Sequence, residues 1–174
     1  ADIDRLCAIA AVLDRQTMPY QASLDGNEQY PDGEAFAQLL AAMRAEPRLQ
    51  RLMASILFIE QPIARAQALT VDLGRAGLGL PVIIDESDGE LDSFVQARAQ
   101  GYAGVSSKTC KGLYKSILNA ARCVAWNGAS EAQRTPPGSG PTRYFLSAED
   151  LTTQAGLSVQ QDLALVNLLG ITHV

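Results

Sequence analysis

The chain has 174 residues, of which 47% are hydrophobic and 19% charged, and this composition excludes an intrinsically disordered chain. Its formal net charge of -5 argues against a surface that binds nucleic acid or an anionic membrane. No apolar run approaches the roughly 20 residues of a membrane span, and the three cysteines lack metal-site spacing, which is typical of reduced thiols. We therefore expect one cytoplasmic domain over residues 1–174, with neither nucleic acid nor membrane as a partner.

Short apolar runs and helical stretches alternate along the first hundred residues. Residues 1–16 have the i, i+3, i+4 apolar spacing of an amphipathic helix. The helix expected over 32–55 is broken or kinked by Pro47. The other elements expected here are strands at about 19–25, 55–60 and 81–85, a helix over 63–79 and a helix over 90–101 that stops at Gly101.

The same alternation continues to the C-terminus. A Pro/Gly-rich surface loop is expected over 134–143. Around it lie predicted strands at about 103–108 and 143–148, helices over 113–128 and 157–170, and a candidate further strand at 171–174.

This order of elements predicts a parallel sheet with right-handed crossovers. A dinucleotide-binding sheet would need a G-x-G-x-x-G turn after its first strand, and the segment DGNEQYPDG at 25–33 does not supply one. A closed barrel is therefore favoured. Because a (β/α)8 TIM barrel has eight strands and typically about 250 residues, we expect the chain to be an α/β part of one, about strands 3 to 7 or 8.

Three acidic residues each end a buried apolar run: Asp25, Glu60 and Asp85. Their spacings of 35 and 25 residues match one βα repeat. Because the C-terminal ends of parallel strands meet on one face of a barrel, these carboxylates are expected to meet in space, as oxygen ligands of one divalent metal. The alternative is that each carboxylate simply caps the following helix. A fourth strand-like run ends in Lys108.

Four motifs, in order and spacing, resemble those of the enolase superfamily, in its mandelate racemase and muconate-lactonizing branch. That family ends its third, fourth and fifth barrel strands in D-x-N, E-Q-P and D-E-S motifs, and its muconate-lactonizing members carry K-x-x-K-G at the sixth. The matching segments are Asp25-Gly-Asn27, Glu60-Gln61-Pro62, Asp85-Glu86-Ser87 and Lys108-Thr-Cys-Lys111-Gly112. The resemblance covers nearly the whole chain and implies an enolase C-terminal domain-like barrel.

The resemblance also implies an isomerase or lyase that abstracts the proton alpha to a substrate carboxylate through an enediolate, with Mg²⁺ as cofactor. In such an enzyme Asp25, Glu60 and Asp85 would bind Mg²⁺ and Lys108 would be the acid/base on one face of a small carboxylate substrate. The family's second lysine, from a K-x-K motif on strand two, has no counterpart here. The only histidine, His173, lies at the C-terminus, which favours the lysine–lysine branch over a His-Asp dyad.

Several of these residues keep two interpretations. Asn27 is either an ordinary turn residue or orients the metal shell by a hydrogen bond. Glu86 could replace Asp85 as the third ligand. Lys108, the candidate acid/base, could instead be a solvated lysine at the entry to a helix. Lys111 could support the metal or contact substrate, but the solvated interpretation is favoured for it.

Residues after the fifth strand are the remaining candidates. Ser147, Glu149 and Asp150 could contact substrate or merely begin a helix. A different class of function is a non-catalytic half-barrel that serves as a structural or interaction module. In either class of function, an open arc of strands exposes the strand edges. We therefore expect these edges to be covered by the missing N-terminal portion of the same protein, and we expect the protein to form a homo-oligomer.

Overall fold

The computed structural model describes residues 2–74, 78–132, 143–148 and 155–172. Its five strands form one parallel sheet in the order β1-β2-β3-β4-β5, so each strand pairs with the next in the chain. The strands are β1 Ala22–Asp25, β2 Ile56–Glu60, β3 Val82–Ile84, β4 Gly104–Ser107 and β5 Phe145–Ala148. The expected parallel α/β architecture is confirmed.

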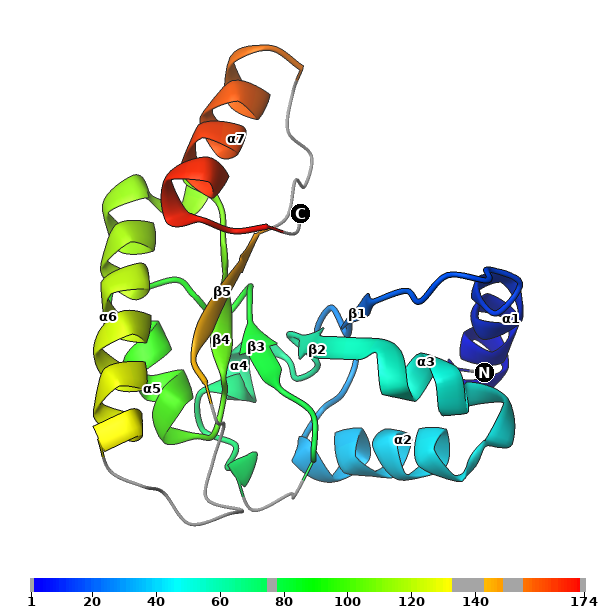
Figure 1. The fold of residues 1–174 in the computed structure, drawn as a ribbon. Coiled ribbons are helices and arrows are strands. Elements are labelled where there is room, and N and C mark those ends of the chain that lie inside the picture. The colour runs from blue at the N-terminus through cyan, green and yellow to red at the C-terminus, as the bar shows by residue number, and fades with distance from the viewer. Residues whose placement is uncertain (1, 75–77, 133–142, 149–154, 173–174) are drawn as a thin grey trace.

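The sheet is curled into a half-barrel, with helices outside it (Figure 1). The rings of Phe58 on β2 and Phe145 on β5 have centroids 5.5 Å apart, although the two strands are not neighbours. In a flat sheet, strands three positions apart are separated by about 14 Å. The contact therefore requires the sheet to bend around its inner side, as the wall of a barrel does.

Helices alternate with the strands along the chain, as expected for βα repeats, with α1 before β1 and α7 after β5. They are α1 Asp2–Leu13, α2 Gly33–Ala45, α3 Gln50–Ser55, α4 Arg65–Ala68, α5 Ser93–Ala99, α6 Leu113–Ala132 and α7 Leu157–Leu169, with 3-10 turns η1 Pro47–Leu49 and η3 Thr109–Lys111. Asp32 caps α2 by accepting a hydrogen bond from the Ala35 N–H at 2.8 Å. The predicted break at Pro47 is confirmed, because α2 ends before it and α3 begins after η1.

The hydrophobic core lies between the outer face of the sheet and the helices. Its strand residues are Ile56, Ile59, Val82, Ile84 and Val105, with Leu24 packed against them. Val82 and Ile84 have the strand period of two, and the wider spacing of Ile56 and Ile59 lies beside the register shift between β1 and β2. Phe36, Leu40 and Met43 of α2 are fully buried on the other side of this core. The residues between these strand positions therefore face inward, and we call their side of the sheet the concave face.

Three expectations about elements are wrong. Among the described residues of the helix expected over 63–79, the α-helix is α4 alone, because the chain turns after Leu69 and the Leu73 N–H donates to Gln100 O at 2.8 Å. The helix expected to end at Gly128 continues to Ala132. Residues 171–172 are not a strand, and 173–174, like 134–142 of the expected loop, lie outside the described residues.

The described part of the chain bears on the cysteine thiols and on a membrane span. All three cysteines, Cys7, Cys110 and Cys123, are free thiols. In the same residues no helix has both the length and the apolar character needed to cross a bilayer.

Candidate functional site

The concave face carries the acidic residues at the ends of β1, β2 and β3. Asp25 is the register partner of Glu60, and Glu60 is the partner of Ile83. Register partners on parallel strands point to the same face, and residues two apart do so as well. Asp85, two residues beyond Ile83, therefore shares the face with Asp25 and Glu60. The sheet thus brings these three predicted residues to one side, at adjacent strand ends.

The register carries the same face across β4 and β5. Ile83 pairs with Gly104, and Ser106 pairs with Ser147. Ser106 and Ser147 are both buried, and Lys108 follows two residues beyond Ser106. Ser147 is therefore a polar residue of the concave face, whereas Glu149 and Asp150 lie outside the described residues.

Two lysines converge on the Asp85 carboxylate. Lys108 Nζ donates to Asp85 Oδ2 at 2.8 Å. Lys111 Nζ donates to Asp85 Oδ1, to Asp85 O at 2.9 Å and to Ser106 O at 3.0 Å. The side chains of Lys108 and Lys111 are only 10% and 14% exposed. The interpretation of either as a solvated lysine is wrong, because both ammonium groups are withdrawn from water and paired with a buried carboxylate.

Asn27 holds the Asp25 carboxylate. Its backbone N–H donates to Asp25 Oδ1 at 2.8 Å and its Nδ2 to Oδ2 at 3.3 Å. Asn27 also has a left-handed backbone, with φ of 40°, which asparagine tolerates better than most residues. Asn27 is therefore a turn residue that also orients the Asp25 carboxylate. Its role beside a bound metal ion stays a prediction.

None of the three acidic residues caps the helix that follows it. The residues in the N-cap position of α2, α4 and α5 are Asp32, Ala64 and Asp92. The capping interpretation of Asp25, Glu60 and Asp85 is therefore wrong.

The pairing of β1 with β2 continues past the strand ends and through the D-G-N and E-Q-P motifs. The backbone bonds are Gly26 N to Glu60 O at 2.8 Å, Glu28 N to Gln61 O at 2.7 Å and Tyr30 N to Pro62 O at 2.9 Å. These bonds fix the two loops against each other. The position of Asp25 beside Glu60 is therefore set by backbone contacts on both sides of it.

Gly26 is required for this close approach. A Cβ at Gly26 would lie 2.6 Å from Pro62 Cα and 3.2 Å from Glu60 O. We expect Gly26→Ala to lower the free energy of unfolding by about 1–3 kcal/mol, because backbone must move to admit the methyl group. Chemical denaturation measures this change. The matched control is Gly89→Ala, where no atom lies within 4 Å of the added Cβ, and equal stability of the two variants would contradict the expectation.

Glu86 lies close to the other carboxylates. Burial raises the pKa of Glu86, and the negative charges of Asp85, Glu28 and Asp25 act in the same direction, against a backbone hydrogen bond that lowers it. Its Oε2 is buried and has no hydrogen-bond partner among the described residues. Glu86 therefore keeps its place as an alternative to Asp85 in a ligand set.

A buried ion pair beside the site was missed by the sequence analysis. Lys115 Nζ donates to Asp88 O and lies 3.2 Å from Asp88 Oδ2, and both side chains are buried. Burial raises the pKa of Asp88, and the nearby Lys115 and Lys111 charges oppose that shift. The pair ties the loop after β3 to α6. The sequence signal was a third lysine, Lys115, four residues after Lys111, although only Lys115 lies in α6 and Lys111 lies in η3.

The side chains do not form a metal site as they stand. Within the described residues, no group of three or more His, Cys, Asp or Glu is arranged to hold a metal ion. Both Asp25 oxygens accept hydrogen bonds from Asn27, and the two Asp85 oxygens accept from Lys108 and Lys111. The donor types and their placement at adjacent strand ends nevertheless fit a hard divalent cation such as Mg²⁺.

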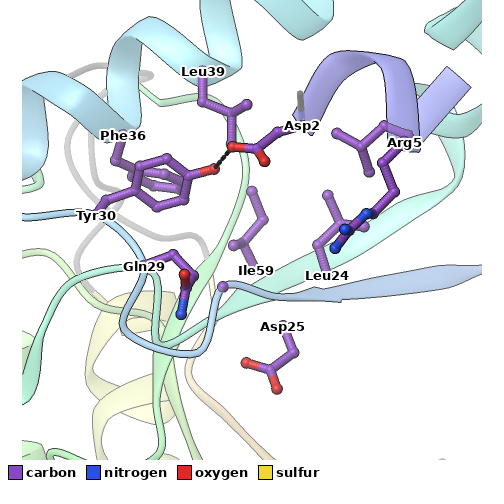
Figure 2. Close-up of a pocket in the computed structure, with 11 residues that line it drawn as sticks. Asp2, Arg5, Leu24, Asp25, Gln29, Tyr30, Phe36, Leu39 and Ile59 are labelled. Carbon is purple, nitrogen blue, oxygen red and sulfur yellow. Dashed lines mark hydrogen bonds between the residues drawn. The ribbon is translucent and has the colours of Figure 1, made fainter.

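A separate pocket of about 340 Å³ lies between α1, β1 and the start of α2. Its floor includes Leu24 and Ile59, which belong to the outer face of the sheet. Figure 2 shows the Asp25 carboxylate pointing away from these apolar side chains, although Asp25 lines the pocket. The pocket is thus on the opposite side of β1 from the carboxylates of the concave face.

A search of solved structures finds a mandelate racemase/muconate lactonizing protein from Herpetosiphon aurantiacus, with a TM-score of 0.57 and 25% sequence identity. The chain has the fold of part of an enolase-superfamily barrel. The match covers 71% of this chain and 33% of the other, so the chain spans about a third of that protein's length. No family model matches the sequence. No curated protein matches it either.

Proposed function

We propose that this chain is the catalytic part of a cytoplasmic isomerase or lyase that removes the proton alpha to the carboxylate of a small substrate. The observation that carries the proposal is the concave face. It presents Asp25, Glu60 and Asp85 from three adjacent strands and Lys108 from the fourth, in the order that the enolase-superfamily motifs have. The racemase, epimerase, cycloisomerase and dehydratase outcomes share this first step through an enediolate.

Asp25, Glu60 and Asp85 would hold a Mg²⁺ ion, with Glu86 as the alternative to Asp85. When bound, the ion would supply positive charge where negative charge develops on the substrate. The protein's own part is to supply the carboxylates from rigid strand ends. Asp25 and Glu60 are in register, and their flanking loops are joined by backbone hydrogen bonds.

Lys108 is the proposed acid/base. General acid–base catalysis requires the group to lie within reach of the substrate's reacting carbon and on a fixed side of it. Lys108 meets the second requirement because it follows β4 on the concave face and its Nζ is held 2.8 Å from Asp85 Oδ2. Ser147 and Lys111, which border the same face, would contact substrate or support the lysine.

The intact protein would complete the site. In the proposed enzyme a second base, the remaining barrel strands and the domain that selects the substrate come from the missing N-terminal portion, and the barrel assembles as a homo-oligomer. One base on one face of the substrate is enough for proton removal. A racemase also needs a proton donor on the opposite face of the substrate.

A second candidate function is a non-catalytic half-barrel that acts as a structural or interaction module. It is favoured by the two lysines that already neutralise Asp85, since a paired carboxylate needs no metal. The two functions differ in whether the intact protein exchanges an α-hydrogen.

Deuterium uptake from heavy water tests the proposal. The intact protein would be incubated with Mg²⁺ and a panel of small acids, dipeptides and sugar acids, and the products analysed by mass spectrometry. We expect uptake at the α-carbon of one compound class, and none after chelation of Mg²⁺. No uptake with any class, by a folded protein that also fails to bind Mg²⁺, would support the module instead.

A further inference from the structure

Gln61, the middle residue of the E-Q-P motif, is fully buried and uses all of its side-chain polar atoms. Its Oε1 accepts hydrogen bonds from the Asp85 N–H at 2.8 Å and the Ser87 N–H at 3.1 Å. Its Nε2 donates to Ile63 O and to Ser87 Oγ, both at 2.7 Å. A primary amide is the side chain that presents two donors and one acceptor oxygen in a single plane.

The backbone of Gln61 adds two further contacts. Its N–H donates to Ile83 O at 2.9 Å, and its carbonyl accepts from the Glu28 N–H at 2.7 Å. Gln61 has a left-handed backbone, with φ of 30°, a conformation that costs free energy in any residue but glycine. Gln61 directly follows Glu60 of β2 and makes hydrogen bonds to the segments that follow β1 and β3. It therefore connects the ends of three strands.

We propose that Gln61 is a positioning residue that holds Asp85 in place relative to Glu60 and thereby sets the metal affinity of the site. This inference rests on the proposed function. Gln61 accepts a hydrogen bond from the Asp85 N–H. The backbone of Asp85 is therefore anchored to the end of β2, the strand that carries Glu60. Lys108 and Lys111 hold the Asp85 carboxylate itself, whereas Gln61 fixes the main chain from which it projects.

The test is Gln61→Met in the intact protein. Methionine keeps the length of the side chain but leaves the Asp85 and Ser87 N–H groups without an acceptor. Titration calorimetry with Mg²⁺ is expected to show an affinity about 10- to 100-fold weaker than wild type, the range found for residues that orient metal ligands. Gln67→Met is the matched control, because Gln67 is exposed on α4 and should leave the affinity unchanged.

A purely structural role would lower the unfolding temperature but leave the Mg²⁺ affinity of the folded protein intact, and that result would overturn the inference. If Gln61→Met does not fold, Ser87→Ala serves instead. It removes one partner of Gln61 Nε2 and should weaken Mg²⁺ binding by a smaller factor, whereas an affinity equal to that of Gln67→Met would overturn the inference. Wild-type protein that binds no Mg²⁺ would overturn the proposed function and this inference together. Wild-type binding that Gln61→Met does not alter would overturn the inference alone.

Discussion

Lys108→Ala is expected to slow α-hydrogen exchange by about 10²- to 10⁴-fold in the intact protein, the range that a positioned acid/base contributes. The physical reason is that alanine leaves no group on that face of the substrate to accept the proton. The measurement is the rate of deuterium uptake by the substrate found in the screen, followed by mass spectrometry.

The matched variant is Lys111→Ala. Lys111 contacts the same carboxylate but also two backbone carbonyls, which suits a supporting role. Its loss should slow exchange much less than the loss of Lys108. If Lys108→Ala exchanges at the wild-type rate while Mg²⁺ binding is intact, Lys108 is not the base.

Glu60→Gln is expected to weaken Mg²⁺ binding by at least about 100-fold, since it replaces a charged oxygen ligand by a neutral amide of the same shape. Glu60 is the central residue of the proposed set, because it ends the strand between β1 and β3. Its side chain is buried, so the amide also keeps the local packing. Calorimetric titration of the folded variant measures the change.

The control for this variant is Glu34→Gln, in the first turn of α2 on an exposed position. It makes the same chemical change away from the concave face and should leave Mg²⁺ affinity unaltered. Equal affinity in the two variants would mean that Glu60 is not a ligand.

Much of the fold was predictable because short strand-like runs alternate with longer helical stretches along the chain. The run at 81–85 is an example: Val82 and Ile84 are buried under the helices, and Ile83 is buried on the concave face. The prediction of a helix over 63–79 was wrong because a tertiary contact outweighed the local apolar periodicity. The hydrogen bond from Leu73 N–H to Gln100 O holds that segment beside the end of α5. The apolar spacing within residues 63–79 carries no information about this long-range contact.

Part of the candidate site was also predictable. A carboxylate at the end of each strand, with one repeat between them, is enough to place Asp25, Glu60 and Asp85 on one face once the sheet is parallel. Side-chain partners were not predictable. Lys111 was expected to be solvated, but the 3-10 turn at Thr109–Lys111 returns its ammonium group to Asp85. The role of Gln61 likewise depends on a backbone conformation that its neighbours impose.

A crystal structure of the intact protein grown with Mn²⁺, with anomalous scattering recorded to locate the metal, tests the central claim most directly. Mn²⁺ takes the oxygen ligands that Mg²⁺ takes. The expected result is one anomalous peak on the concave face, within bonding distance of the carboxylates of Asp25, Glu60 and Asp85, with Lys108 displaced from Asp85. The contradictory result is a folded barrel with no peak there and Asp85 still paired with both lysines.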